Sequence, residues 1–333
     1  MTPAAAEVLT LQGTLTSFED AAVKVLPKSS GLNVSASMVE RITERSGRNL
    51  AERERCGETF GPDRDWNWHR DRAGHRCAYV SLDATGVSQQ AEDASRKPGR
   101  LAWVGEIFNP TPPKASPRER IWDARYHSGL MSLPEMGRRL RKTALSVGIE
   151  QADVVIGLTD GGSGLEDCLL DHVFAGLGAQ IEFILDFYHV SEHIHDFAQQ
   201  LHSGDEDSIT QQAHEWCRLL KQEGGRALLE HLEQLDMAHS TPSVVEGHRQ
   251  LCGYLRNNLH RTDYPRYLSH GWQIGSGTIE SACKNVVNHR LNGTGMRWSE
   301  HGTTELCHLR ALFKSQPGVW DDFWSRSSTK SAA

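Results

Sequence analysis

The sequence predicts an α/β protein with a mixed sheet that is flanked by helices. Short apolar runs bounded by turn residues recur between residues 77 and 185, and helical apolar spacing separates only the later ones. With 333 residues, the chain is long enough to bury a full core. Its 38% hydrophobic and 24% charged residues are ordinary for a soluble protein. These features favour one large domain with an appendage or insertion.

The N-terminal segment, residues 1–60, is predicted to be helical. Ser17-Phe-Glu-Asp20 resembles a capping box ahead of a helix over 21–26, and residues 36–55 carry apolar side chains at helical spacing. Two short helices around a glycine-containing turn are typical of a DNA-binding helix-turn-helix and equally of a plain helical hairpin. Three arginines of the second helix would face DNA in the first interpretation and solvent in the second: Arg41, Arg45 and Arg48.

Residues 77–190 are predicted to form the first part of the core. The expected strands cover 77–83, 101–108 (after a turn at 96–99), 125–130, 153–158 and 181–185, and the expected helices cover 134–148 and 164–174. No helix falls between the first three strands, which excludes the alternation of a doubly wound sheet. The resulting order β-β-β-α-β-α-β is that of the RNase H-like fold, in which the ends of strands one and four lie side by side.

Three acidic residues stand at the ends of these elements. Asp83 closes the first apolar run, Asp160 follows the fourth strand, and Glu280 opens a helix behind the glycine-rich turn Gly275-Ser-Gly277. The predicted strand order brings Asp83 and Asp160 together. Carboxylate oxygens suit Mg²⁺, and two such ions can clamp the attacking and leaving oxygens of a phosphodiester. The three residues are therefore predicted to be metal ligands and catalytic residues, with Mn²⁺ as a substitute for Mg²⁺.

Each of these residues also has a plainer interpretation. Asp83 suits a turn after a strand, Asp160 suits the cap of a glycine-rich loop, and Glu280 complements the dipole of the helix that it opens. Asp186 rivals Asp160 as the second carboxylate because it also ends an apolar strand, but the strand order favours Asp160. His189 fits two roles, orienting the site and capping a helix.

The rest of the chain is predicted to be a helical insertion over 191–265, followed by a C-terminal part of the core over 266–333 with the catalytic helix and a basic tail. Leucine-rich stripes in the insertion are core-forming, and His193 is expected on a helix surface. The candidate DNA contacts are cations for phosphates and an indole for stacking on an unpaired end base: Lys284, Arg290, Arg297 and Trp298. Trp298 fits a place in the protein core equally well.

Composition narrows the class of protein further. The net charge of −7 does not mark a nucleic-acid binder, but it counts only weakly against DNA because lysine and arginine gather between residues 284 and 314. Seven scattered cysteines argue against a disulfide scaffold and a zinc ribbon. No apolar run approaches the ~18 residues that span a bilayer, and no signal peptide is evident. A cytoplasmic protein without membrane contact is expected.

Three strings of residues resemble the ISKra-four family of insertion-sequence transposases. They are Ile184-Leu-Asp-Phe-Tyr-His-Val-Ser-Glu-His193, Gln273-Ile-Gly-Ser-Gly-Thr-Ile-Glu-Ser-Ala-Cys-Lys284 and Arg290-Leu-Asn-Gly-Thr-Gly-Met-Arg-Trp-Ser299. A weaker likeness runs over nearly the whole chain, from about residue 3 to residue 323. The resemblance implies a nucleoid-associated transposase of the DDE type, which cuts and joins transposon ends in double-stranded DNA with Mg²⁺ as a synaptic homodimer.

The resemblance also implies roles for particular residues. The acidic triad of the family would correspond to Asp83, Asp160 and Glu280, and Asp186 with His189 resembles the Cys/Asp-x-x-His element of Mutator-like relatives. Family members carry a further region ahead of the stretch that matches residues 1–15, which favours a shortened copy. Two other functions fit the residues: a catalytically silent DNA-binding remnant or repressor, and a metal-dependent nuclease without strand transfer.

Overall fold

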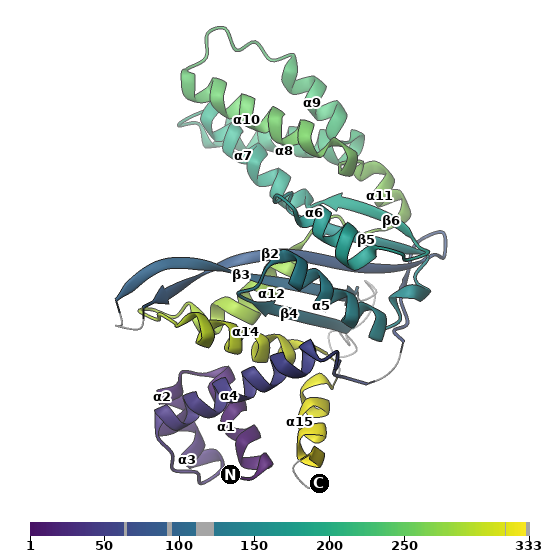
Figure 1. The fold of residues 1–333 in the computed structure, drawn as a ribbon. Coiled ribbons are helices and arrows are strands. Elements are labelled where there is room, and N and C mark those ends of the chain that lie inside the picture. Colours follow the sequence, from purple (N-terminus) through teal and green to yellow (C-terminus); the bar gives the residue numbers. More distant parts are fainter. Residues whose placement is uncertain (63–64, 92–94, 111–122, 317, 331–333) are drawn as a thin grey trace.

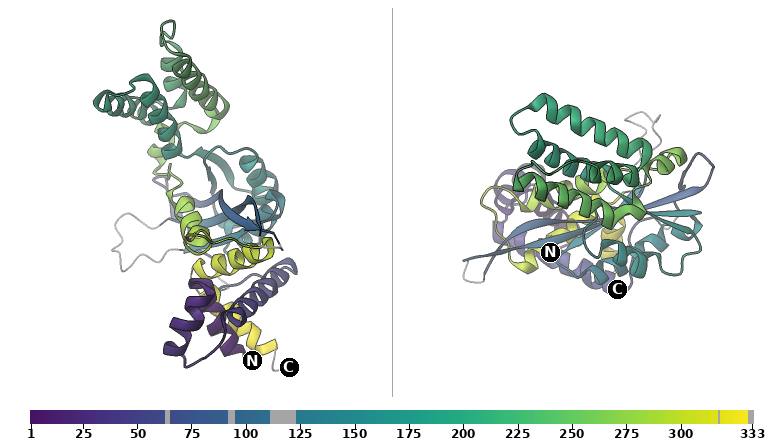
Figure 2. Two further views of the ribbon diagram at one scale, coloured as in Figure 1. Left: turned by 90° about the vertical axis from the view of Figure 1, so that its left-hand side faces the viewer. Right: turned by 90° about the horizontal axis from the view of Figure 1, so that it is seen from above.

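The structure is a computed structural model that describes residues 1–62, 65–91, 95–110, 123–316 and 318–330. A β-sheet lies in the middle of the molecule, a bundle of helices projects from one side, and the N-terminal helices lie on the opposite side with α15 (Figures 1 and 2). The main helices are α1 (Pro3–Leu15), α2 (Phe18–Asp20), α3 (Leu26–Ser29), α4 (Ala36–Arg55), α5 (Leu133–Ser146), α6 (Leu165–Cys168), α7 (Phe187–Leu201), α8 (Glu206–Glu223), α9 (Gly225–Glu233), α10 (Pro242–Asn258), α11 (Tyr264–His270), α12 (Gly277–Ala282), α13 (His289–Leu291), α14 (Glu300–Lys314) and α15 (Val319–Lys330).

Within the described residues, six strands form one mixed sheet. Its order is β4-β3-β2-β5-β6, and β1 pairs with the start of β2. β2, β3 and β4 are antiparallel neighbours, whereas β5 runs parallel to β2 and to β6. The predicted mixed sheet is confirmed, and the first and fourth predicted strands are neighbours in it. The strands are β1 (His69–Arg70), β2 (Arg76–Gln90), β3 (Arg96–Asn109), β4 (Asp123–Gly129), β5 (Val154–Thr159) and β6 (Gln180–Leu185).

β2 and β3 are longer than predicted, and the turn predicted at 96–99 lies inside β3. Beyond Ser81, where the pairing to β5 ends, β2 still pairs with β3. Beyond Ala84, where the pairing of β3 to β4 has also ended, the two strands continue as a two-stranded hairpin. Trp298 holds this hairpin: its backbone N–H donates to Ser88 at 3.1 Å, and its carbonyl accepts from the N–H of Gln90 at 2.9 Å. The outer half of the hairpin is polar, so it lacks the apolar run that predicts a buried strand.

Helices cover both faces of the sheet. α5 packs Leu140 against Leu82 and Ile107 on one face, and Gly105 permits the close approach because a Cβ there would lie 2.7 Å from Leu140 Cδ1. α12, α14 and the π-helical turn between α12 and α13, η5 (Cys283–Asn288), cover the other face. Burial of a large apolar side chain contributes about 1.5–3 kcal/mol, so these contacts fix α12 on the sheet.

The stretch predicted as a helical insertion is helical. α7 to α10 pack around an apolar cluster that continues into the end of β6 through Leu185 and Phe187. Inside the cluster, the rings of Phe197 and Trp216 stack with their centroids 5.4 Å apart. Because the cluster is continuous, the insertion is anchored at the edge of the sheet where β5 and β6 end (Figure 1).

The N-terminal helices dock on α14. α4 covers the predicted helix over 36–55, and α1, which lies in the segment predicted to be helical without bounds of its own, packs beside α4. The predicted helix over 21–26 is largely a π-helical turn, η1 (Ala21–Val25). At the contact, a Cβ on Gly47 would lie 2.7 Å from the backbone oxygen of Glu305, and Arg48 pairs with Glu305 at 2.8 Å. Four arginines of α4 are exposed: Arg41, Arg45, Arg48 and Arg55.

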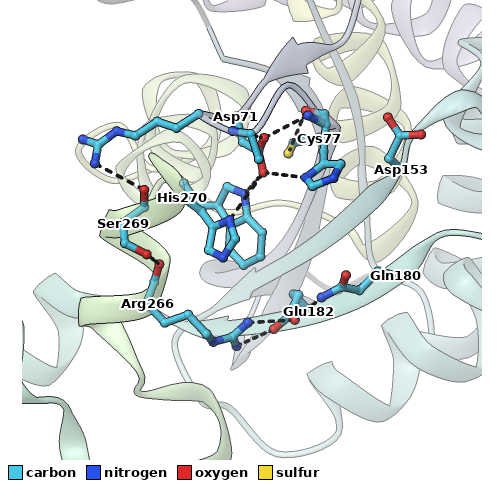
Figure 3. Close-up of polar contacts among 12 residues, drawn as sticks. Asp71, Cys77, Asp153, Gln180, Glu182, Arg266, Ser269 and His270 are labelled. Carbon is cyan, nitrogen blue, oxygen red and sulfur yellow. Dashed lines mark hydrogen bonds and ion pairs between the residues drawn. The ribbon is translucent and has the colours of Figure 1, made fainter.

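The segment that leads from the insertion to α12 is fixed against the sheet (Figure 3). The buried carboxylate of Asp71 accepts a hydrogen bond from Trp272 Nε1 at 3.3 Å and lies 3.6 Å from His270 Nδ1. Arg266 donates two hydrogen bonds to Glu182 of β6, at 3.0 and 2.7 Å. These two sets of contacts fix the position of the segment that leads into the glycine-rich turn before α12.

All seven cysteines lie in the described part of the chain and are unpaired thiols. Across the described residues, no helix has both the length and the apolar character of a membrane span.

Candidate active site

Asp83 lies two residues beyond Ser81, the last residue of β2 that pairs with β5. Asp83 does not end its strand, contrary to the prediction, because β2 continues to Gln90. Its Oδ1 accepts a hydrogen bond from the backbone N–H of Ala84 at 2.6 Å, and its Oδ2 accepts one from the thiol of Cys283 at 3.4 Å. The carboxylate is therefore held between the sheet and the helix that follows α12.

Asp160 directly follows β5, as predicted. Its Oδ1 accepts a hydrogen bond from the N–H of Gly162 at 2.8 Å, and its backbone oxygen accepts one from the hydroxyl of Tyr254 in α10, also at 2.8 Å. Gly161 has a φ of 91°, a left-handed conformation that glycine adopts readily and that turns the chain sharply after the strand. The turn and Tyr254 together fix Asp160 at the end of β5.

The structure brings Asp83 and Asp160 together, in keeping with the strand order. Burial raises the pKa of the Asp83 carboxyl, and the negative charge of Asp160 raises it further. Hydrogen bonds from Ala84 and Cys283 and the charge of His189 act in the opposite direction. Among the described groups that act on this pKa, none is a lysine or an arginine. The carboxylates of Asp83 and Asp160 thus lie close enough for the charge of Asp160 to act on the pKa of Asp83.

Glu280 stands in the first turn of α12, as predicted, and its side chain is exposed. It lies one helical turn before Cys283, the residue that contacts Asp83, so the two share one side of the helix. The described residues contain no set of three His, Cys, Asp or Glu side chains arranged to bind one metal ion. The structure therefore brings Asp83 and Asp160 close together, whereas Glu280 is exposed one helical turn away from the residue that contacts Asp83.

Asp186, the rival second carboxylate, is engaged in structural hydrogen bonds. It is buried and caps α7, because its Oδ1 accepts from the backbone N–H of Tyr188 at 2.9 Å. Its Oδ2 accepts from the hydroxyl of Ser276, in the turn before α12. These contacts leave Asp160 as the better partner for Asp83.

Tyrosine and histidine rings from α7 and α10 pack against one another beside Asp160. The ring of Tyr254 lies 4.4 Å from that of His193 and 6.2 Å from that of His189, measured between centroids. His193 was expected on a helix surface but is half-buried, and burial lowers its pKa. Because Asp186 caps α7, the capping role predicted for His189 falls to another residue. Nothing in the sequence predicted Tyr254, whose partner lies 94 residues away.

A buried acid that the sequence did not predict, Glu106 of β3, lies near the pair. It is fully buried opposite Ser81, and the two-residue period of a strand puts Ser81 and Asp83 on the same face of the sheet. Burial raises the pKa of Glu106 to about 8, and the nearby hydroxyls of Thr278 and Tyr126 offset only part of this effect. An acid that is mostly neutral at pH 7 therefore lies on the same face of the sheet as Asp83. A single glutamate inside an otherwise apolar run was the signal for it.

Two of the four predicted DNA contacts face inward. Arg290 is 2% exposed, and its guanidinium lies 4.8 Å from the ring centroid of Phe18 and 4.9 Å from that of Trp298. This burial does not fit a phosphate contact by Arg290, and it favours the core interpretation of Trp298. The other two predicted contacts are exposed: Lys284 and Arg297.

No family model matches the chain, and no curated protein matches it. The carboxylate pair of Asp83 and Asp160 is therefore the main observation that bears on function.

Proposed function

We propose that this chain is a DDE-type DNA transposase with an RNase H-like core, which cleaves and joins the ends of an insertion sequence in a Mg²⁺-dependent reaction. The observation that carries the proposal is the convergence of Asp83 and Asp160 where the parallel pairing of β2 and β5 ends. The strand order β4-β3-β2-β5-β6 supports the RNase H-like core. The resemblance of the three sequence strings supports the choice of a transposase.

The two carboxylates fit a divalent cation. Hard oxygen ligands are those that Mg²⁺ prefers, and Asp83 and Asp160 would hold such an ion. Its positive charge would offset the burial and the charge of Asp160, which raise the pKa of Asp83. Bound there, Mg²⁺ would stabilise charge on the phosphodiester and lower the pKa of the attacking hydroxyl. Glu280 is the proposed third ligand, and its exposed side chain would have to turn toward the pair from the adjacent turn of α12.

The protein residues hold this pair rigid, which is the main requirement of phosphoryl transfer. The thiol of Cys283 and the N–H of Ala84 orient Asp83, and Tyr254 fixes the backbone of Asp160 from the insertion. In cleavage, water attacks phosphorus and the 3′-oxygen leaves with a proton. In joining, that 3′-hydroxyl attacks a phosphodiester of the target and displaces its 3′-oxygen in the same way. Neither step requires a covalent bond between protein and DNA.

The proposed partner is double-stranded DNA, as transposon end and as target, bound by a homodimer in the synaptic complex. Lys284 lies one turn after Glu280 and is exposed, and Arg297 is exposed beyond the same helical segment. Both are proposed to contact phosphates of the bound duplex. Their charge supplies the local attraction that the net charge of −7 lacks.

The proposal is tested by cleavage of a labelled duplex that carries the ends of the source element, in Mg²⁺. Asp83→Asn, Asp160→Asn and Glu280→Gln are each expected to abolish cutting, whereas Asp171→Asn, at an exposed carboxylate of the same core, is the matched control. Joined products separate a transposase from a nuclease. Binding by every variant with cutting by none, wild type included, would identify a DNA-binding remnant.

A further inference from the structure

Tyr188 is more exposed than any other aromatic residue that the structure describes. Its side chain is 65% exposed, whereas every other phenylalanine, tyrosine and tryptophan in the described ranges is buried or half-buried. Tyr188 belongs to the Asp-Phe-Tyr-His string, of which Asp186 and His189 already have places in the site. The tyrosine itself has no role in the proposed phosphoryl transfer.

The ring of Tyr188 is held on one side by a glycine. A Cβ added to Gly275 would lie 2.4 Å from Cε2 and 2.6 Å from Cδ2 of the tyrosine, so the ring sits where any larger residue would project. The neighbouring ring of Phe187 meets it edge-on, with centroids 5.7 Å apart. The high exposure of Tyr188 shows that much of the ring remains open to solvent. The result is a platform that is seated on the protein and free to receive a planar group.

Tyr188 is linked to the carboxylate site through its neighbours Asp186 and His189. The backbone N–H of Tyr188 donates to Asp186, the same carboxylate that holds Ser276 in the turn leading to Glu280. The next residue, His189, is close enough for its charge to act on the carboxyl of Asp83. A phosphodiester placed at the carboxylate pair would thus bring its adjoining nucleotides near this ring.

We propose that Tyr188 stacks on an unpaired base at the end of the DNA substrate, next to the scissile phosphate; this inference rests on the proposed function. Every base has a π-face, so one aromatic ring can hold an end base without reading its identity. Trp298 was the sequence-based candidate for this role. Its indole is packed against Phe18 and donates to the backbone of Leu291 at 2.9 Å, which leaves Tyr188 to supply the stacking surface.

The test measures stacking without cleavage. The full chain carrying Asp83→Asn is mixed with a forked duplex of the element end, in which 2-aminopurine replaces the unpaired base beside the cleavage site. Quenching of the 2-aminopurine fluorescence and the Kd are expected to be kept by Tyr188→Phe and by Leu170→Ala, a control at another exposed apolar residue. Tyr188→Ala is expected to lose the quenching and to bind about 10-fold more weakly, in line with base–aromatic stacking.

Gly275→Ala offers an independent check, because its Cβ would push the ring away while the backbone at this position does not require glycine. It should lose quenching as Tyr188→Ala does, and should add nothing further when combined with Tyr188→Ala. Unchanged quenching and affinity in Tyr188→Ala would overturn the stacking inference and leave the proposed function standing. No binding of the duplex by the parent protein would instead overturn the proposed function, and the stacking inference with it.

Discussion

The hydroxyl of Ser276 donates a hydrogen bond to the carboxylate of Asp186, across 90 positions of the sequence. The same carboxylate caps α7 through the N–H of Tyr188. One buried acid therefore ties the start of the insertion to the turn that opens α12 and carries Glu280. This relationship assigns Asp186 a positioning role, which is distinct from the metal-binding role proposed for Asp160.

Replacement of Asp186 should cost stability. Asp186→Ala is expected to lower the free energy of unfolding by about 2 kcal/mol, because it removes a helix cap and leaves the Ser276 hydroxyl without its acceptor. Ser276→Ala removes only one hydrogen bond and should cost about 1 kcal/mol. Urea unfolding monitored by circular dichroism measures both. Asp160→Asn, which keeps an acceptor for Gly162, is the control, and an equal loss of stability there would argue against a special role for Asp186.

Replacement of Asp83, unlike that of Asp186, should not lower the free energy of unfolding. Burial and the charge of Asp160 both disfavour the ionised Asp83, so Asp83→Asn removes an unfavourable charge and should be at least as stable as wild type at pH 7 without metal. The variant should also lose stabilisation by Mg²⁺. For wild type, Mg²⁺ at 100 times its Kd should add about 2.7 kcal/mol to the free energy of unfolding. Thermal unfolding with and without Mg²⁺ measures the difference, and a wild type indifferent to Mg²⁺ would contradict the metal-site proposal.

Glu106 should make stability fall as pH rises. Its folded-state pKa of about 8 lies above the ordinary value of 4.5, so between these values the unfolded chain is ionised while the folded chain retains the proton. The free energy of unfolding should therefore decrease between pH 5.5 and 7.5, by at most about 1.4 kcal/mol per pH unit from this group. Glu106→Gln should remove that slope.

The control for Glu106 is Glu182→Gln. Arg266 overcomes the effect of burial and lowers the pKa of Glu182, so this group is ionised in both states above pH 4.5 and contributes no slope in the same window. Urea titrations of the three proteins at pH 5.5 and 7.5 give the comparison. An undiminished slope in Glu106→Gln would mean that another buried group is responsible.

The strands of the core were predictable because buried strands appear in the sequence as short apolar runs. Their order along the chain predicted that Asp83 lies beside Asp160. The outer half of the β2–β3 hairpin was not predictable, since its pairing is polar and is completed by Trp298, far along the chain. The roles of Tyr254 and Asp186 likewise depend on partners 94 and 90 residues away. Such contacts follow from tertiary packing, which leaves no local pattern in one sequence.

The sequence also does not show which arginines are buried and which are exposed. Arg290 and Arg297 allow this difference to be tested. Arg290 and Arg297 are indistinguishable as cations in the sequence, yet Arg290 is buried between Phe18 and Trp298 and donates from Nε to the backbone oxygen of Gly13 at 3.0 Å. Arg290→Ala should therefore lower the free energy of unfolding by about 3 kcal/mol, because it removes packing, two cation–π contacts and a buried hydrogen bond.

Arg297→Ala should change stability by less than about 0.5 kcal/mol, because the residue is exposed. If Arg297 contacts a phosphate, its replacement should weaken DNA binding and reduce the slope of log Kd against log salt concentration by about 1. Folded Arg290→Ala protein should keep the wild-type slope, since its guanidinium is sequestered from DNA. Fluorescence anisotropy across a salt series measures both slopes, and a reduced slope for Arg290→Ala alone would show that the buried arginine is released when DNA binds.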